Sequence, residues 1–354
     1  MNPISEYNLA GLQQQLAAWG FRTSHARRLL VHYYGRAGTV DWPGLRLPRR
    51  LQDRLQAEGR LLGSSVAARQ VAADGTIKLL LKLGDGRTVE SVVMPAFQAD
   101  RVAGCVSSQV GCAMACDFCA TTQTGFERNL SAGEMVEQFL HLRREAAGAG
   151  RRLQTVVFMG MGEPMLNLEN VLEAARRMAG EALGALGWRQ VTVSTVGIVP
   201  GIDAMAAADL NINLAVSLHA PDDATRARLI PSGRRFGVEE IMAAAGRYQA
   251  KQGRPVSIQY CLLRGVNDSP GQARQLAALL NGRRMHVNLL HYNPTGRSLT
   301  GQRYEPSPLA VADAFMGELR ARGLVAHFRR SRGSEIDAAC GQLRRRVAIN
   351  IPFP

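Results

Sequence analysis

The first 60 residues repeat apolar positions every three or four residues, which is typical of amphipathic helices. Helices are expected at 9–19 and 24–34, with Ser24 as the capping residue of the second, and two prolines mark a break before residue 50. This part of the chain therefore predicts a small helical accessory domain at 1–62.

Between residues 64 and 95 the apolar period shortens to two, as expected for strands. Asp-Gly pairs at positions 74 and 85 separate three such runs, and this dipeptide strongly favours the tight turn of a β-hairpin. The expected strands are 66–71, 76–83 and 88–94. We predict that they form a short β-hairpin linker at 63–103 that leads into the core.

From residue 104 onward, predicted strands and helices alternate. Ser131 and Glu134 form a capping box that opens the first helix, because each side chain binds a backbone N–H left unpaired at the helix start. The expected strands are 155–159, 190–195, 213–218, 256–262 and 286–290, and the expected helices are 134–146, 170–181, 201–208, 238–252 and 269–280. This alternation predicts an α/β fold with a parallel sheet, in which functional side chains gather at the carboxyl ends of the strands.

The composition is that of a folded protein: 354 residues, of which 46% are hydrophobic and 20% charged. The longest apolar runs are far shorter than the roughly 20 residues that a membrane helix needs. The amino-terminal segment also lacks the charged start and apolar middle of a secretory signal. We therefore expect a cytoplasmic protein with no membrane partner.

Charge adds the first indication of a partner, since 43 Lys and Arg against 29 Asp and Glu give a net charge of +14. Only Lys78, Lys82 and Lys251 are lysine, and arginine is the side chain that pairs with phosphate in a planar fork and stacks on bases. Basic residues are concentrated at 21–69 and 319–346. An arginine-rich genome would explain the choice of arginine but not this surplus, so both ends predict contact with a phosphate backbone.

Three cysteines carry the most specific motif. Cys112, Cys116 and Cys119 have the spacing Cys-x3-Cys-x2-Cys, which suits three irons of a 4Fe–4S cubane and leaves the fourth iron open to bind substrate. The alternatives are a four-ligand zinc site, with Cys105 or a distant histidine as the fourth ligand, and plain buried cysteines.

This spacing, with Phe118 directly before the last cysteine, resembles the signature of radical S-adenosylmethionine (SAM) enzymes. The resemblance implies two cofactors, SAM and a 4Fe–4S cluster that Cys112, Cys116 and Cys119 hold. It also implies that the open iron binds the methionine part of SAM, and that one electron then cleaves SAM to a 5′-deoxyadenosyl radical.

Further segments resemble the RlmN/Cfr family of RNA adenine methyltransferases. These segments are 105–112, 125–130, 157–164, 217–219 and 336–343. The resemblance implies a partial (βα)6 radical SAM barrel at 104–354, with a C-terminal extension that carries Cys340, and an RNA-binding role for the accessory domain. The implied substrate is an adenosine of 23S rRNA, with tRNA as a second substrate in some members. Gly125 and Phe126 favour methylation of carbon 2; carbon 8 methylation and a non-catalytic iron–sulfur or zinc RNA-binding protein stay open as alternatives.

The family resemblance also assigns roles to residues outside the cluster motif. An electron-poor adenine carbon cannot displace a methyl group from SAM, so the methyl must travel on a thiol and react as a radical. By resemblance, Cys340 carries the methyl group, Cys105 resolves the adduct through a disulfide and Glu90 is the base, although Glu90 by itself looks like a solvated strand residue. Cys261 lies in an apolar run and is expected in the core. The SAM contacts implied in this way are Gly162, Glu163, Ser194, Ser217, Leu218, His219 and Asn293.

The turn at 160–163 can also be interpreted without the family, because its glycines permit close backbone approach and Glu163 could accept hydrogen bonds from a ligand amine. An ordinary tight turn is the alternative. The expected partners are RNA and a flavodoxin-type electron donor, and we expect a monomer.

Overall fold

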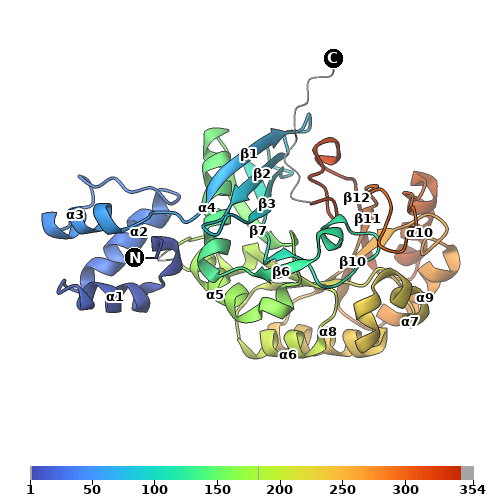
Figure 1. Cartoon of the computed structure of the whole chain (residues 1–354). Helices are drawn as coiled ribbons and strands as arrows, with labels where there is room; N and C mark the ends of the chain where they lie inside the picture. Colours follow the sequence, from blue (N-terminus) through green and yellow to red (C-terminus); the bar gives the residue numbers. More distant parts are fainter. Residues whose placement is uncertain (1, 182, 344–354) are drawn as a thin grey trace, which may run out of the picture.

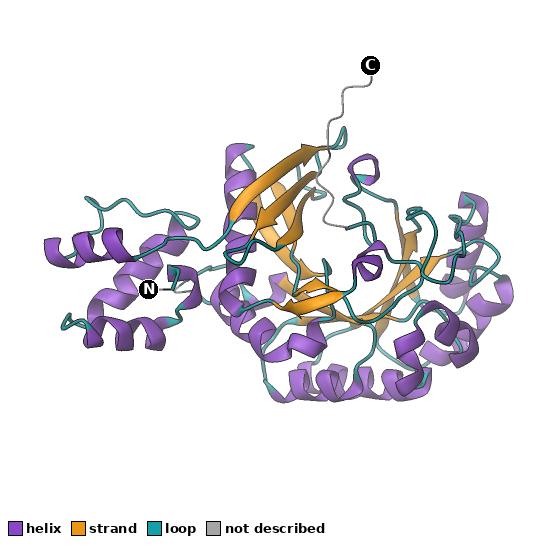
Figure 2. Ribbon diagram, in the orientation of Figure 1, coloured by secondary structure: helices purple, strands orange, loops and turns teal. Residues whose placement is uncertain are grey.

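One ten-stranded sheet runs through the molecule in the order β1-β2-β3-β4-β7-β8-β9-β10-β11-β12, and the computed structural model describes residues 2–181 and 183–343. The sheet is curved, and most helices follow its outer side (Figures 1 and 2). Its strands are β1 Ser65–Val71, β2 Ile77–Lys82, β3 Thr88–Pro95, β4 Arg101–Cys105, β7 Arg152–Phe158, β8 Val191–Thr195, β9 Asn213–Ser217, β10 Val256–Leu262, β11 Met285–His291 and β12 Val325–Arg329. Within the described residues no pairing joins β12 back to β4, so the barrel is open.

Within the ten-stranded sheet, β4 and the strands from β7 to β12 all run parallel to one another, and helices connect them. The connecting helices are α4 Ala132–Gly148, α5 Leu168–Ala179, α6 Val199–Ala207, α7 Asp223–Leu229, α8 Val238–Gln252, α9 Pro270–Leu280 and α10 Leu309–Ala321. A parallel sheet is covered by helices on one face and by packed side chains on the other, so few strand residues are exposed. In β9, for example, Leu214, Ala215 and Val216 are all buried. The α/β fold class and the partial (βα)6 barrel are confirmed.

Helix starts follow the sequence signals closely in this part of the chain. The capping box of Ser131 and Glu134 forms as predicted, with the Glu134 N–H donating to Ser131 Oγ at 3.0 Å. Ser269 and Gln272 make a second capping box at the start of α9. Satisfied N–H groups at these ends fix where each helix begins, and thereby where the preceding loop ends.

The strands β1, β2 and β3 occupy the three segments predicted as strands, with turns at Gly75 and Gly86 in the left-handed region. They are not separated from the core sheet, since β3 pairs antiparallel with β4 and places Val92 opposite Cys105. The predicted linker therefore extends the core sheet. The domain boundaries at 62 and 103 stay predictions.

The N-terminal helices lie to one side of the sheet in Figure 1, and they are α1 Leu9–Ala18, α2 Ser24–Gly35 and α3 Arg49–Glu58. The prediction of Ser24 as a cap is wrong: Ser24 is the first helical residue, and Thr23 before it makes no side-chain capping bond. The helix α3 follows Pro48 directly, after the predicted break, in a segment for which no particular helix was predicted.

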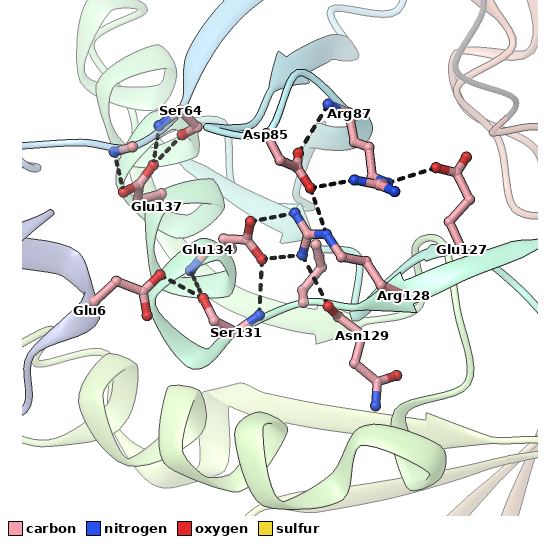
Figure 3. Close-up of polar contacts among 12 residues, drawn as sticks. Glu6, Ser64, Asp85, Arg87, Glu127, Arg128, Asn129, Ser131, Glu134 and Glu137 are labelled. Atoms are coloured by element: carbon pink, nitrogen blue, oxygen red, sulfur yellow. Dashed lines mark hydrogen bonds and ion pairs between the residues drawn. The ribbon is translucent and has the colours of Figure 1, made fainter. Parts of the chain in front are cut away.

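One buried carboxylate of α4 and the serine that caps this helix fasten the N-terminal part of the chain to the core (Figure 3). The carboxylate of Glu137 accepts hydrogen bonds from the N–H of Gly63 at 2.6 Å, from the N–H of Ser64 at 2.7 Å and from the hydroxyl of Ser5. Ser131 donates to Glu6 at 2.6 Å. These contacts hold the accessory helices and the entry to β1 in a fixed place beside the sheet.

A second set of polar contacts holds the small hairpin of β5 (Gln109–Gly111) and β6 (Phe126–Asn129) in place. Arg128 of β6 binds Glu134 through both terminal nitrogens, at 2.8 and 2.7 Å, and donates to Asp85 at 2.8 Å (Figure 3). The bidentate geometry gives this pair both strength and a set orientation.

Among the described residues, no helix is both long and apolar enough to cross a bilayer.

Candidate active site

The three cysteines of the predicted cluster motif lie in the loop between β5 and β6. Cys112 follows β5 directly, and its N–H donates to the carbonyl of Gly125 at 3.0 Å. Gly111 has a positive φ, and a Cβ there would collide with that same carbonyl, so only glycine allows the loop to begin this way. Cys119 turns back on Cys116, with a 3.0 Å hydrogen bond between their backbones. The loop therefore closes on itself and keeps the three sulfurs in one region.

Asp117 anchors this loop to the segment that follows β11. Its carboxylate accepts hydrogen bonds from the hydroxyl of Thr300 at 2.7 Å and from the hydroxyl of Tyr304 at 2.8 Å. Burial alone would raise the pKa of Asp117, but the hydrogen bonds from Thr300 and Tyr304 lower it. A permanently ionised Asp117 thus ties the cluster loop to the far side of the barrel.

The chemistry of the three sulfurs fits a cationic metal centre. Burial raises the pKa of Cys112 to about 12 and that of Cys116 well above its usual range, so neither forms a thiolate without a positive partner. No cysteine in the described chain forms a disulfide. Within residues 2–181 and 183–343, no three His, Cys, Asp or Glu side chains converge on one point as the ligands of a single ion do. Cysteines that each bind a different iron of a cluster have no such need to converge.

Arg226 of α7 is a site residue that sequence reasoning missed. It is 1% exposed and donates from Nη1 to the carbonyl of Gly233 at 3.2 Å and from Nη2 to the carbonyl of Val196. Its charge lies close enough to Cys116 and Glu163 to favour their ionised forms. An arginine on a short helix gives no sequence signal of this kind, because burial depends on the elements around it.

The turn after β7 holds a second buried carboxylate. Glu163 is 2% exposed, and its two oxygens accept hydrogen bonds from the N–H of Met165 at 3.0 Å and the N–H of Val196 at 2.9 Å. Burial raises the pKa of Glu163 to about 7 against the opposing effect of these bonds. Gly162 has φ +102°, and a Cβ on it would collide with Gln109, so the close approach predicted for this turn is made to the chain that leads into the cluster loop.

The other predicted SAM contacts stand at the carboxyl ends of successive strands. Ser194 is the penultimate residue of β8 and donates to the carbonyl of Phe158 at 2.8 Å, and Ser217 ends β9. Asn293 follows β11 and is 6% exposed. Leu218 is fully buried, with its N–H bonded to the carbonyl of Gln259. The positions agree with the edge of the sheet expected for ligand groups, and their contact with SAM stays a prediction.

His219 connects this edge to the cluster loop. Its ring packs edge-on against Phe118, with 4.9 Å between the ring centroids. Its Nδ1 accepts a hydrogen bond from the N–H of Cys261 at 2.9 Å, which leaves the ring proton on Nε2. Burial lowers the pKa of His219 to about 3, with a smaller contribution from Arg226, so the imidazole is a neutral donor.

The structure brings together the two predicted catalytic thiols. Burial raises the pKa of Cys105 at the end of β4, and the neighbouring Cys340 raises it further. Cys119 acts in the same way on Cys340, so the three thiols are electrostatic neighbours. Cys340 is exposed to solvent, and desolvation by the surrounding protein nevertheless raises its pKa. Cys261 lies in the core as predicted, but next to these thiols.

The C-terminal segment reaches the site by crossing from the hairpin strands to the cluster loop. Near its start, the N–H of Gly333 donates to Asp74 at 3.0 Å. At its far end, the carbonyl of Gly341 accepts from the N–H of Ala120 at 2.7 Å, and the carbonyl of Leu343 accepts from Thr121 at 2.9 Å. Cys340 is therefore held directly beside the residue that follows Cys119. The arginines at 344–346, part of the predicted basic end, lie outside the described residues.

Glu90, which its strand pattern alone would put in solvent, is fully buried on β3. Its carboxylate forms an ion pair with Lys78 at 3.1 Å. Ser107 donates to its backbone carbonyl at 2.7 Å. A buried, charge-compensated carboxylate beside the strand of Cys105 is consistent with a functional role and not with a solvated face.

The comparisons with known proteins agree with one another. The model of the radical SAM superfamily matches residues 106–304, a range that contains the cluster motif and excludes Cys105 and Cys340. The chain is 67% identical to the probable dual-specificity RNA methyltransferase RlmN 1 of Opitutus terrae, over 96% of both chains. It is 42% identical to the probable dual-specificity RNA methyltransferase RlmN of Thermus thermophilus, over 100% of this chain and 95% of the relative. A crystal structure of a radical SAM methyltransferase from Sphaerobacter thermophilus matches with a TM-score of 0.91 and 42% identity, over 97% of this chain and 99% of that chain.

Proposed function

Because this chain belongs to the RlmN family within the radical SAM superfamily, we propose that it methylates carbon 2 of an adenosine in 23S rRNA, with tRNA as a second substrate. Carbon 8 of adenine is the alternative position. The protein acts in the cytoplasm as a monomer, with a flavodoxin-type protein as electron donor. A 4Fe–4S cluster and SAM are its cofactors.

The observation that carries this proposal is the meeting of three thiols from distant parts of the sequence. Cys119 belongs to the cluster loop, Cys105 ends β4, and Cys340 is supplied by the C-terminal segment. A protein that used its metal centre only to bind RNA would not need two further thiols beside it. The arrangement supports a reaction that uses one thiol as a carrier and another to release it.

We assign cofactor binding to the residues of the strand edge and the cluster loop. Cys112, Cys116 and Cys119 hold the cluster, and Glu163 and the neutral His219 present an acceptor and a donor toward SAM. Gly162, Ser194, Ser217, Leu218 and Asn293 complete the SAM contacts in this proposal. When bound, the cluster supplies the electron that cleaves SAM and generates a 5′-deoxyadenosyl radical.

The chain's own thiols then divide the methyl transfer into steps. The sulfur of Cys340 accepts a methyl group from a first SAM by displacement, and a second SAM provides the radical that removes a hydrogen atom from this S-methyl group. The carbon radical on Cys340 adds to the adenine ring and links protein to RNA. To become aromatic again, this adduct loses the ring proton to Glu90 and one electron, which the iron–sulfur cluster would accept. The thiolate of Cys105 then attacks the sulfur of Cys340, so that a disulfide forms and the sulfur–carbon bond breaks, and the released methylene carbon takes up a proton to become the methyl group.

The experiment that tests the proposal supplies deuterated methyl groups. Anaerobically prepared protein is incubated with a reductant, a 23S rRNA fragment and SAM whose methyl group is fully deuterated, and nucleosides are analysed by mass spectrometry against 2- and 8-methyladenosine standards. We expect 2-methyladenosine that has lost part of the deuterium, because the radical removes one hydrogen from the methyl group. Unmethylated RNA would contradict the proposal, and 8-methyladenosine would favour the alternative position.

Exposed arginines of the accessory helices support RNA as the substrate. Arg27 and Arg46 line one surface hollow together with Arg28, which donates to the carbonyl of Arg46 at 2.9 Å and so holds that loop. We predict that Arg27→Gln with Arg46→Gln weakens RNA binding for all sequences alike and lowers the slope of log affinity against log salt by about one per lost phosphate contact. Filter binding between low and moderate salt measures this slope. The matched control is Arg247→Gln, since Arg247 pairs with Asp203 on the outer helices; an equal loss there would rule out a specific surface.

A further inference from the structure

Lys78 and Glu90 form a buried ion pair in the middle of the antiparallel strands. The two groups are 3.1 Å apart, and their side chains are 6% and 1% exposed. Removing two opposite charges from water costs about as much as their attraction returns, so such a pair is weak evidence for stability. Its presence beside a catalytic site calls for a functional reason.

The strand register places this pair on the same face of the sheet as Cys105. Lys78 of β2 lies opposite Val92 of β3, and Val92 lies opposite Cys105 of β4. Residues paired across antiparallel strands point to one face, and Glu90 shares it because it stands two residues from Val92. Lys78, Glu90 and Cys105 therefore face the side that the C-terminal segment covers.

Lys78 also contacts the segment that carries Cys340. Its Nζ donates to the carbonyl of Asp337 at 3.4 Å, three residues before Cys340. Asp337 has a positive φ of 52°, a left-handed conformation that is uncommon for a non-glycine residue. One ammonium group thus touches both the carboxylate of Glu90 and the backbone that leads to Cys340.

We propose that Lys78 is a positioning residue that holds the carboxylate of Glu90 in place as the base and sets the Cys340 segment against it. This inference rests on the proposed function. After the carbon radical has added to the ring, the adduct must lose one proton and one electron to become aromatic again; the proton goes to Glu90, and the electron returns to the iron–sulfur centre that had supplied one. Without the ammonium group of Lys78, neither the carboxylate of Glu90 nor the backbone at Asp337 is held where removal of the ring proton requires it.

The test replaces Lys78 by methionine, which has similar length and no charge, and by arginine, which keeps the charge. For Lys78→Met we expect methylation of Cys340 by SAM at the normal level, a fall of about tenfold to a hundredfold in methylated adenosine, and accumulation of a protein–RNA adduct. Lys78→Arg is expected to restore turnover and remove the adduct. The matched control is Lys82→Met, at the exposed end of the same strand, which should behave as the unchanged protein.

A measurement without turnover separates the charge effect from misfolding. We expect a lower melting temperature for Lys78→Met than for the double variant Lys78→Met with Glu90→Gln, because the second change removes the buried acidic group that has lost its ion pair with Lys78. Normal turnover by Lys78→Met, or an equal loss of Cys340 methylation and adduct resolution, would overturn the inference. If the unchanged protein never methylates Cys340, it is the proposed function that fails.

Discussion

Replacing Cys340 by alanine is expected to abolish RNA methylation, with a loss of at least about a thousandfold, the scale seen when a catalytic nucleophile is removed. No other side chain can carry the methyl group in the proposed reaction. Cys340 is exposed, so the substitution leaves no unfilled core volume and the protein should keep its fold. The loss is measured as methylated adenosine formed per protein under reducing, oxygen-free conditions.

The control for this variant is Cys261→Ala. Cys261 is a buried cysteine close to the same thiols, and the proposal gives it no role. We expect it to retain turnover after allowance for any change in folded fraction. The Cys340→Ala protein should still cleave SAM, because the cluster cysteines and the strand edge are unchanged. Normal RNA methylation by Cys340→Ala would show that the carrier scheme is wrong.

Replacing Cys105 by alanine is expected to stop the reaction one step later. Cys340 still accepts a methyl group and still adds to the ring, but no thiolate is left to attack its sulfur. The protein should therefore remain covalently bound to RNA after a single turnover. A denaturing gel would show a nuclease-sensitive band of higher mass, and a peptide containing residue 340 would carry the mass of an adenosine.

The double variant Cys105→Ala with Cys340→Ala provides the control, since it lacks the sulfur that forms the link. It should give no adduct at all. Repeated turnover by Cys105→Ala would assign the resolving role to another group. An adduct that persists in the double variant would mean that the bond to RNA forms elsewhere.

The core elements could be predicted from the sequence because several independent signals agreed. The helix at 238–252 and the strand at 256–262 have the predicted bounds, and the capping box of Ser131 and Glu134 starts α4 as expected. Strong apolar periodicity and a satisfied helix start both depend on neighbours along the chain. Such local effects do not depend on which elements pack against the segment.

The helix α3 and the strand β12 could not be predicted, because each buries few apolar residues. The helix α3 buries only Leu51 and Leu55 among charged residues and begins right after Pro48. The helix α10 and the strand β12 complete the barrel, but β12 buries one of its five residues, so its sequence shows no clear alternation. Their conformation is decided by the sheet edge and the helices they pack against.

The features of the candidate site also divide into those that have a local sequence signal and those that do not. The cluster motif and the strand-end residues were identifiable because their spacing or position is local. Three other features of the site depend on segments far apart in the sequence. They are the burial of Arg226, the ion pair of Lys78 with Glu90 and the position of Cys340. Nothing in the sequence around a charged residue indicates that it will be buried. These contacts could therefore be identified only in the folded structure.

The bond between Thr121 and Leu343 joins positions 222 residues apart, and this spacing orders events during synthesis. At about 5–20 residues per second, the loop with the three cysteines leaves the ribosome roughly 10–45 s before the closing segment does. Iron and sulfide can therefore be delivered to an open nascent chain. The last thiol is added to the chain only after this interval.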